Sequence, residues 1–254
     1  GLDAAYQPLT FGWQVGGVLE KATGKSLSAL MQQYLVEPLA LDGAYFGVAE
    51  SEFARVARPL AKLKTEPKPA LQTKPKPKKA SAFDKAVEWS GQNPQDFQDA
   101  MIPKGMKKFS FFSDEGLKAV IPAANGVFTA NSLAKIYAML ANAGEWNGQQ
   151  LIRRDIFKAL STVQYTQRDR IMPLPMHWRL GYHRVLTLGK KSKGFGHMGF
   201  NGSGAWCDPE RNLSFAYTHN FATASITGDY RLWGLTQETL RCADEALKGR
   251  KGWF

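Results

Sequence analysis

The spacing of apolar residues changes along this chain, from a helical period in the first part to strand-like runs after about residue 178. Recurrence at i, i+3, i+4 and i+7 predicts helices at 11–22, 27–35 and 133–140. The later runs are short and bounded by turn residues, and they predict strands at 180–188, 195–198, 204–207 and 213–217. The order of the strands and their short turns predicts an antiparallel meander.

Cap and stop residues set the expected boundaries of the first helices. Gly24 follows the first helix as a C-terminal stop, Ser26 is placed to cap the second, and Pro38 is expected to end it. The two are expected to form a helical hairpin. The apolar residues that give the first helix its period are Phe11, Val15, Val18, Leu19 and Ala22.

A looser helical pattern follows the strands, from Tyr230 to Leu247, and is expected to lie across one face of the sheet. Helices first, strands later and a covering helix last predict an α+β fold, with an antiparallel β-sheet flanked by helices and a helical subdomain. We place the division near residue 175. Residues 1–175 then form the mainly helical subdomain, and residues 176–254 give the strands and C-terminal helix of an α/β subdomain.

The net charge of +11 is concentrated in one segment. Residues 62–79 hold seven lysines and one acid, Glu66, so more than half of the excess lies there. Three Lys-Pro pairs within about 59–82 block helix and sheet ladders, which predicts an extended, solvated insertion. Because the remainder is only mildly basic, we expect no nucleic-acid partner. Contact of the insertion with an acidic surface stays open as an alternative.

Cysteine, histidine and hydropathy patterns exclude several classes of protein. Cys207 and Cys242 allow at most one disulfide and are expected to be buried free thiols. The four histidines and two cysteines show no ligand spacing, so we expect no metal and no cofactor. No run approaches the roughly 20 apolar residues of a membrane-spanning helix, so no transmembrane segment is expected.

Three short segments, in this order, carry candidate chemistry. They are Tyr6-Gln7-Pro8-Leu9-Thr10-Phe11-Gly12-Trp13, Pro122-Ala123-Ala124-Asn125-Gly126 and Gly196-His197-Met198-Gly199. Together they resemble the serine β-lactamase and penicillin-recognising superfamily, most closely its carboxylesterase-like branch. The likeness spans nearly the whole chain apart from the Lys-Pro insertion. In the third segment, β-lactamases usually carry Lys-Thr-Gly and the esterase-like members His-x-Gly.

The resemblance implies that Tyr6 is a general base. A serine hydroxyl is a poor nucleophile until a neighbouring base takes its proton. A free phenol has a pKa near 10, so a cation is needed to favour the phenolate. In the family that cation is the lysine of Ser-x-x-Lys. The alternative for Tyr6 is a half-buried loop tyrosine.

The third segment implies an oxyanion site. In the family, the residue after the motif's glycine donates its backbone N–H to the developing oxyanion, which is Phe200 here. Gly199 lets the substrate approach closely. His197 is mostly neutral near pH 7, so it is expected to hydrogen-bond a substrate or Tyr6 rather than to anchor a carboxylate. A structural histidine is its alternative, and His177, His183 and His219 are expected to be structural or on the surface.

Two further residues are candidate substrate contacts. Trp178 is a possible wall of an acyl pocket, with core packing as its alternative. Asn125 is a possible substrate contact, with turn formation as its alternative.

The nucleophile has no obvious place in this chain. Only five residues precede Tyr6, whereas the family's Ser-x-x-Lys lies well before the tyrosine. The literal match, Ser132-Leu133-Ala134-Lys135, follows it, and the helical spacing of Leu133 predicts that Ser132 and Lys135 point to solvent. Ser203 lacks a strand-to-helix elbow and is interpreted as a turn residue. We therefore expect an N-terminal companion fragment that carries Ser-x-x-Lys, so that this chain alone is inactive.

The departures from the family pattern favour ester hydrolysis. Pro8 stands where β-lactamases and peptidases commonly place an asparagine, and proline offers no side-chain amide. With His197, this predicts a small-molecule ester substrate and a carboxylesterase-like serine hydrolase that forms an acyl-enzyme. The alternative is a non-catalytic homologue that acts in binding, with the Lys-Pro insertion as a contact surface.

Overall fold

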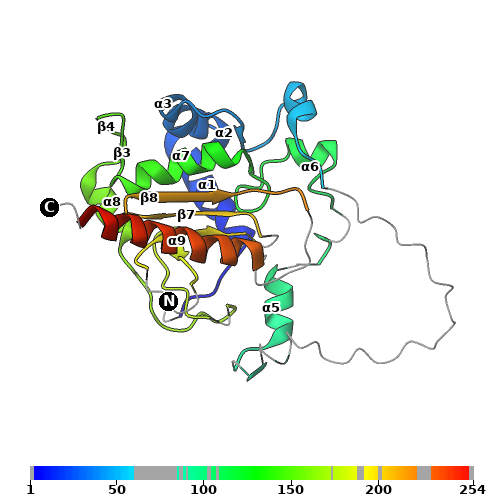
Figure 1. Cartoon of the computed structure of the whole chain (residues 1–254). Helices are drawn as coiled ribbons and strands as arrows, with labels where there is room; N and C mark the ends of the chain where they lie inside the picture. The colour runs from blue at the N-terminus through cyan, green and yellow to red at the C-terminus, as the bar shows by residue number, and fades with distance from the viewer. Residues whose placement is uncertain are drawn as a thin grey trace, which may run out of the picture.

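The computed structural model describes residues 3–59, 85, 88–89, 91–101, 104–106, 109–172, 174–187, 192–199, 202–221 and 230–251. The Lys-Pro insertion therefore lies outside the described residues, except for Pro59. A four-stranded antiparallel sheet lies at the centre of the molecule, with helices on both sides of it (Figure 1). None of the helices in these ranges has both the length and the apolar character needed to cross a bilayer. The predicted α+β fold class is confirmed.

The first helix ends and the second begins at the residues that the sequence marks. Helix α1 (Thr10–Thr23) stops at Gly24, whose φ of 67° is left-handed and whose N–H bonds the Glu20 carbonyl. Ser26 caps α2 (Leu27–Met31) by accepting from the Ala29 N–H. The chain continues through a π turn, η1 (Gln32–Val36), into α3 (Glu37–Leu39). Pro38 therefore lies inside the last turn, and the helical path ends one residue after it.

The apolar stripe of α1 is exposed, and its glycines face inward instead. Phe11, Val15, Val18 and Leu19 are all exposed, Val18 to 67%. Gly12 and Gly16 are the buried residues of the helix. The absence of a side chain at Gly12 lets α1 approach Ala123, because an added Cβ would lie 2.6 Å from the Ala123 nitrogen.

Short elements connect α3 to the central part of the fold. The small strands are β1 (Ala44–Tyr45) and β2 (Val127–Phe128), which pair with each other, and the hairpin β3 (Glu145–Trp146) and β4 (Gln149–Gln150). The remaining helices are η2 (Glu50–Arg55), α5 (Pro94–Met101), α6 (Asp114–Lys118), α7 (Ala130–Ala141) and α8 (Arg154–Ser161). Two of these helices have side-chain caps from their preceding residue, Ser113 for α6 and Thr129 for α7.

The central sheet has the order β5-β6-β7-β8, and every pair is antiparallel. Its strands are β5 (His183–Arg184), β6 (Phe195–Met198), β7 (Gly204–Asp208) and β8 (Leu213–Tyr217). The predicted pairing around the turn that begins at Asp208 is present, with Gly204 opposite Tyr217 and Asp208 opposite Leu213.

Alternation along β7 divides the core between two helices. Ala205 and Cys207 belong to the cluster that contains Tyr137 and Leu140 of α7, whereas Trp206 packs with Leu240 of α9 (Tyr230–Lys251). The two helices thus cover opposite faces of the sheet (Figure 1). The domain boundary near residue 175 stays a prediction. Helix α7 precedes this boundary in the sequence, yet it contacts β7 and β8, which follow it.

Two expectations about buried side chains are only partly met. Cys207 is a buried free thiol as expected, but Cys242, on α9, is an exposed free thiol. Along α9, Leu232 and Leu240 are fully buried while Leu235 is exposed. Between Leu232 and Leu240 in the sequence of α9, the polar residue Thr236 is also fully buried. Its hydroxyl oxygen accepts a hydrogen bond from the Trp206 indole at 3.1 Å.

Candidate active site

The two residues predicted to share the site meet at the end of β6. The Tyr6 hydroxyl lies 3.2 Å from Nε2 of His197, although 191 residues separate them in the sequence. Tyr6 lies in the segment that leads into α1, and His197 is held by pairing with Ala205 on β7. The structure therefore brings a phenol and an imidazole to one edge of the central sheet.

The imidazole ring of His183 lies next to that of His197. Its Nδ1 lies 2.7 Å from the Arg184 carbonyl, and its Nε2 lies 3.0 Å from the Met198 backbone N–H. A carbonyl can only accept, so Nδ1 carries the proton and Nε2 is the acceptor. The two imidazole centroids are 5.1 Å apart. The prediction that His183 is structural agrees with this arrangement.

Burial keeps both imidazoles neutral at physiological pH. Loss of solvent lowers the pKa of His197 from 6.5 to about 4. The same cause, with a smaller repulsion from His197, lowers the pKa of His183 to about 3. His197 is consequently a hydrogen-bonding group at this site and not a cation.

An aromatic stack and a buried carboxylate complete the surroundings of Tyr6. The Trp178 ring stacks on the Tyr6 ring, with centroids 5.5 Å apart and planes at 13°. The Trp178 indole N–H donates to Oδ2 of Asp169 at 2.9 Å, and the Tyr6 backbone N–H donates to Oδ1 at 3.2 Å. Sequence reasoning did not identify Asp169, which stands alone between Arg168 and Arg170 with no motif around it.

Burial also disfavours ionisation of the phenol. Loss of solvent, followed by the charge of Asp169, raises the pKa of Tyr6 from 10.0 to about 12. Within the described ranges, the Tyr6 hydroxyl hydrogen-bonds His197, and no lysine or arginine lowers its pKa. A phenolate at this position therefore requires a cation from outside these ranges.

A tight turn follows His197 at the predicted oxyanion edge. The Gly199 N–H donates to the Ser203 carbonyl at 2.8 Å, and the Gly202 N–H donates back to the Gly199 carbonyl at 3.0 Å. A Cβ at Gly199 would lie 2.9 Å from the Ser203 carbonyl oxygen, so this turn favours glycine. Phe200, the predicted oxyanion donor, lies outside the described residues.

Asn125 has its side-chain amide fully engaged by the backbone. Its Nδ2 donates to the Gly116 and Ala119 carbonyls at 2.9 and 2.7 Å, and its Oδ1 accepts from the Ile121 N–H at 2.9 Å. These bonds favour the turn-forming alternative over a substrate contact.

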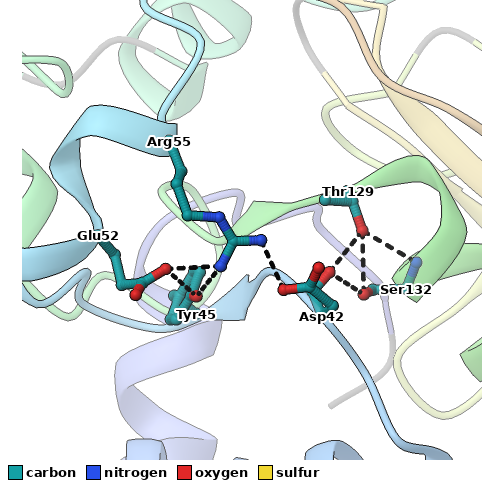
Figure 2. A network of polar contacts seen from close by, with 6 residues as sticks. All are labelled: Asp42, Tyr45, Glu52, Arg55, Thr129 and Ser132. Atoms are coloured by element: carbon teal, nitrogen blue, oxygen red, sulfur yellow. Dashed lines mark hydrogen bonds and ion pairs between the residues drawn. The ribbon is translucent and has the colours of Figure 1, made fainter.

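The literal Ser-x-x-Lys match is part of a structural network, and the expectation that it points to solvent is wrong. Ser132 is only 1% exposed, and its hydroxyl donates to the Asp42 carbonyl at 2.8 Å (Figure 2). Lys135 donates to the Ala40 carbonyl at 2.7 Å. The turn after α3 covers the start of α7, so the two residues join these segments.

In the part of the chain that the structure describes, no three His, Cys, Asp or Glu side chains gather as a metal site would require.

Comparison with known proteins gives the chain its family. A model of the family described as Beta-lactamase matches residues 1–237. The Esterase/beta-lactamase LipL of Mycobacterium tuberculosis is 33% identical over 219 residues, which are 85% of this chain and 48% of LipL. The chain thus spans about half the length of the curated relative it matches.

Solved structures share the fold. A penicillin-binding protein homologue from Caulobacter crescentus has a TM-score of 0.72 and 27% identity, covering 95% of this chain and 59% of that one. A family VIII carboxylesterase has a TM-score of 0.70 at 23% identity and covers 91% of this chain and 57% of that one. With the family match over residues 1–237, these findings confirm the resemblance carried by the three motifs, and the chain belongs to the Beta-lactamase family.

Proposed function

We propose that this chain is part of a carboxylesterase-like serine hydrolase in which Tyr6 is the general base of an acyl-enzyme mechanism. The observation that carries the proposal is the 3.2 Å contact between the Tyr6 hydroxyl and His197 at the end of β6. A nucleophile placed at this edge would lie beside both a proton acceptor and the tight turn at Gly199. That arrangement fits acyl transfer.

The proposed reaction has two halves. The Tyr6 phenolate takes the serine proton as the serine oxygen bonds to the acyl carbon, and the tyrosine then returns that proton to the departing alkoxide. Water then attacks the acyl-enzyme. Tyr6 takes the proton of the water and returns it to the serine oxygen, and the acid is released. His197 hydrogen-bonds the phenol through both halves, and the backbone N–H of Phe200 is the proposed oxyanion donor.

The nucleophilic serine and its lysine are proposed to come from a polypeptide segment outside these 254 residues. Ser132 and Lys135 are engaged elsewhere, and the family member LipL is about twice as long as the matched region. The exposed stripe of α1, defined by Phe11, Val15, Val18 and Leu19, supports the same proposal, because contiguous apolar surface marks an interaction site.

A small-molecule ester is the proposed substrate, and no nucleic-acid partner is proposed. Pro8 removes a side-chain amide, and neutral His197 offers no charge for a substrate carboxylate. The names of LipL, an esterase/beta-lactamase, and of the family VIII carboxylesterase structure both include ester hydrolysis, which supports an ester substrate.

Labelling with a fluorophosphonate probe tests the proposal. We expect the purified 254-residue chain alone to remain unlabelled. Protein that also contains the segment with Ser-x-x-Lys should be labelled on that segment. The intact mass of the labelled species identifies the polypeptide. Labelling of this chain by itself would contradict the proposal.

A non-catalytic binding role is the second candidate. The pKa of about 12 for Tyr6 favours it, since the phenol stays protonated without a nearby cation. Complete absence of labelling, with the nucleophile segment present, would support this candidate.

A further inference from the structure

Asp169 is a buried carboxylate that accepts four hydrogen bonds from N–H groups among the described residues. The residue is only 1% exposed. Its Oδ1 accepts from the backbone N–H groups of Tyr6 at 3.2 Å and of Ile171 and Met172 at 2.8 Å each. Its Oδ2 accepts from the Trp178 indole at 2.9 Å. Both oxygens therefore act as acceptors, as in an ionised carboxylate.

These four bonds compensate for burying the charge. A buried carboxylate without partners is strongly destabilising, whereas bonds between an anion and N–H donors are stronger than neutral ones. Two of the bonds, to Ile171 and Met172, only close the loop after Asp169, as aspartate commonly does. The other two reach Tyr6 and Trp178, which are distant in sequence and belong to the candidate active site.

The loop that carries Asp169 is itself fixed to its surroundings. Nε2 of Gln92 donates to the backbone carbonyls of Asp169 and Met172 at 2.7 and 2.6 Å. The Arg170 N–H donates to the Ala4 carbonyl at 2.9 Å, and the Arg170 guanidinium pairs with Asp3. The carboxylate is thus held in place relative to the segment that precedes Tyr6.

We propose that Asp169 is the positioning residue of the general base. One oxygen fixes the backbone of Tyr6, the other fixes the indole that stacks on its ring, and together they hold the phenol against His197. This inference rests on the proposed function, in which Tyr6 takes the serine proton. It adds a specific role for a residue that does not itself touch the substrate.

Asp169→Asn separates this role from simple loop closure. The variant keeps the size of the side chain but replaces one acceptor by a donor, so either Tyr6 or Trp178 loses its partner. In the protein with its nucleophile segment, kcat should fall by about 10²-fold, as expected for a misplaced catalytic group, with KM changed far less.

The matched control is Asp208→Asn. Asp208 is equally buried and accepts from Ser192 and Arg211, but it lies at the opposite end of β7 from the site. Loss of stability alone would affect both variants, whereas loss of positioning affects only Asp169→Asn.

A direct readout is the ¹⁹F resonance of Tyr6 in this chain labelled with 3-fluorotyrosine, assigned by Tyr6→Phe. It should shift and broaden in Asp169→Asn and stay unchanged in Asp208→Asn. If Asp169→Asn does not fold, Asp169→Glu, which keeps both carboxylate oxygens but moves them by one methylene, should shift the same resonance. An unchanged Tyr6 resonance in the folded Asp169 variant overturns the proposal.

Activity measurements distinguish failure of the proposed function from failure of the positioning role of Asp169. If Tyr6→Phe keeps full activity, the proposed function fails whatever Asp169 does. If Tyr6→Phe is inactive while Asp169→Asn retains the wild-type kcat, only the positioning role fails.

Discussion

At the scale of single residues, Tyr6 combines a position suited to catalysis with an environment that opposes ionisation. Its hydroxyl reaches His197, yet burial and Asp169 raise its pKa to about 12. A lysine within a few ångströms would act in the opposite direction by stabilising the phenolate. In the proposed mechanism, the site therefore depends on a positive charge that the described residues do not supply.

Replacing Tyr6 by phenylalanine should remove turnover and leave the fold intact. The proposed proton acceptor is lost, so kcat should fall by about 10²- to 10⁴-fold. Only one hydrogen bond disappears from the folded protein, so the free energy of unfolding should change by about 1 kcal/mol. Ester hydrolysis and urea titration measure the two effects. Tyr34→Phe, at an exposed tyrosine, is the control, and retained activity in Tyr6→Phe would remove Tyr6 from the mechanism.

Stability should decrease as the pH falls below about 6.5, the unperturbed histidine value. The pKa values of His197 and His183 are lowered to about 4 and about 3, so between pH 6.5 and 4 the unfolded chain binds more protons. Stability is thus complete above 6.5 and is lost towards the folded-state values. Urea titrations at pH 7, 5.5 and 4.5 measure the slope, which should be shallower in His197→Asn. An identical slope in that variant would contradict this cause.

Sequence analysis could identify Tyr6 and His197 because both lie in short motifs whose order is informative. Asp169 gave no such signal, since its role depends on contacts with residues far away in the sequence. The orientation of Ser132 was mispredicted for a related reason. Helical spacing describes which way a side chain points from its own helix, but the turn after α3 covers that side of α7.

At the scale of elements, α1 shows how glycines can determine which face of a helix packs. Its apolar side chains give the helical period, but the close contacts are made at Gly12, which approaches the Ala123 backbone, and at Gly16, which approaches the Leu27 side chain. The helix boundaries and the β7–β8 turn were predictable because caps and turns are local. The burial pattern of α1 depends on its tertiary neighbours.

Two alanine substitutions in α1 should have opposite effects. Alanine favours a helix over glycine by about 1 kcal/mol. Gly17→Ala should show this gain, because nothing lies within 4 Å of the added methyl. Gly12→Ala should instead lose about 1–3 kcal/mol, since its methyl meets the backbone of Ala123. Thermal and urea denaturation of both variants measure the difference, and a stabilised Gly12→Ala would show that α1 is free to shift.

At the scale of the whole molecule, the two faces of the central sheet are covered while α1 exposes apolar side chains. The α+β fold class could be predicted because apolar residues with helical spacing come first in the sequence and strand-like apolar runs come later. The assignment of α7 to the sheet required the three-dimensional contacts, because its sequence pattern is that of any amphipathic helix.

A charged residue in the α1 stripe should weaken association with the proposed nucleophile segment. Val18→Lys, at a side chain that is 67% exposed, should be tolerated by the isolated chain and reduce binding of that segment by about tenfold or more. Tyr230→Lys on α9, at an 83% exposed position, is the control. Isothermal titration calorimetry measures both, and equal affinities would place the contact elsewhere.

The distance in sequence between Tyr6 and His197 has a consequence for how this chain folds. Joining residues 191 positions apart carries a loop-closure entropy that local elements do not have, and contacts of this kind slow folding. During synthesis the phenol emerges from the ribosome long before its histidine does. A nascent chain can therefore form α1 and α2 early, but it cannot assemble this pair until β6, the second strand of the central sheet, has been translated.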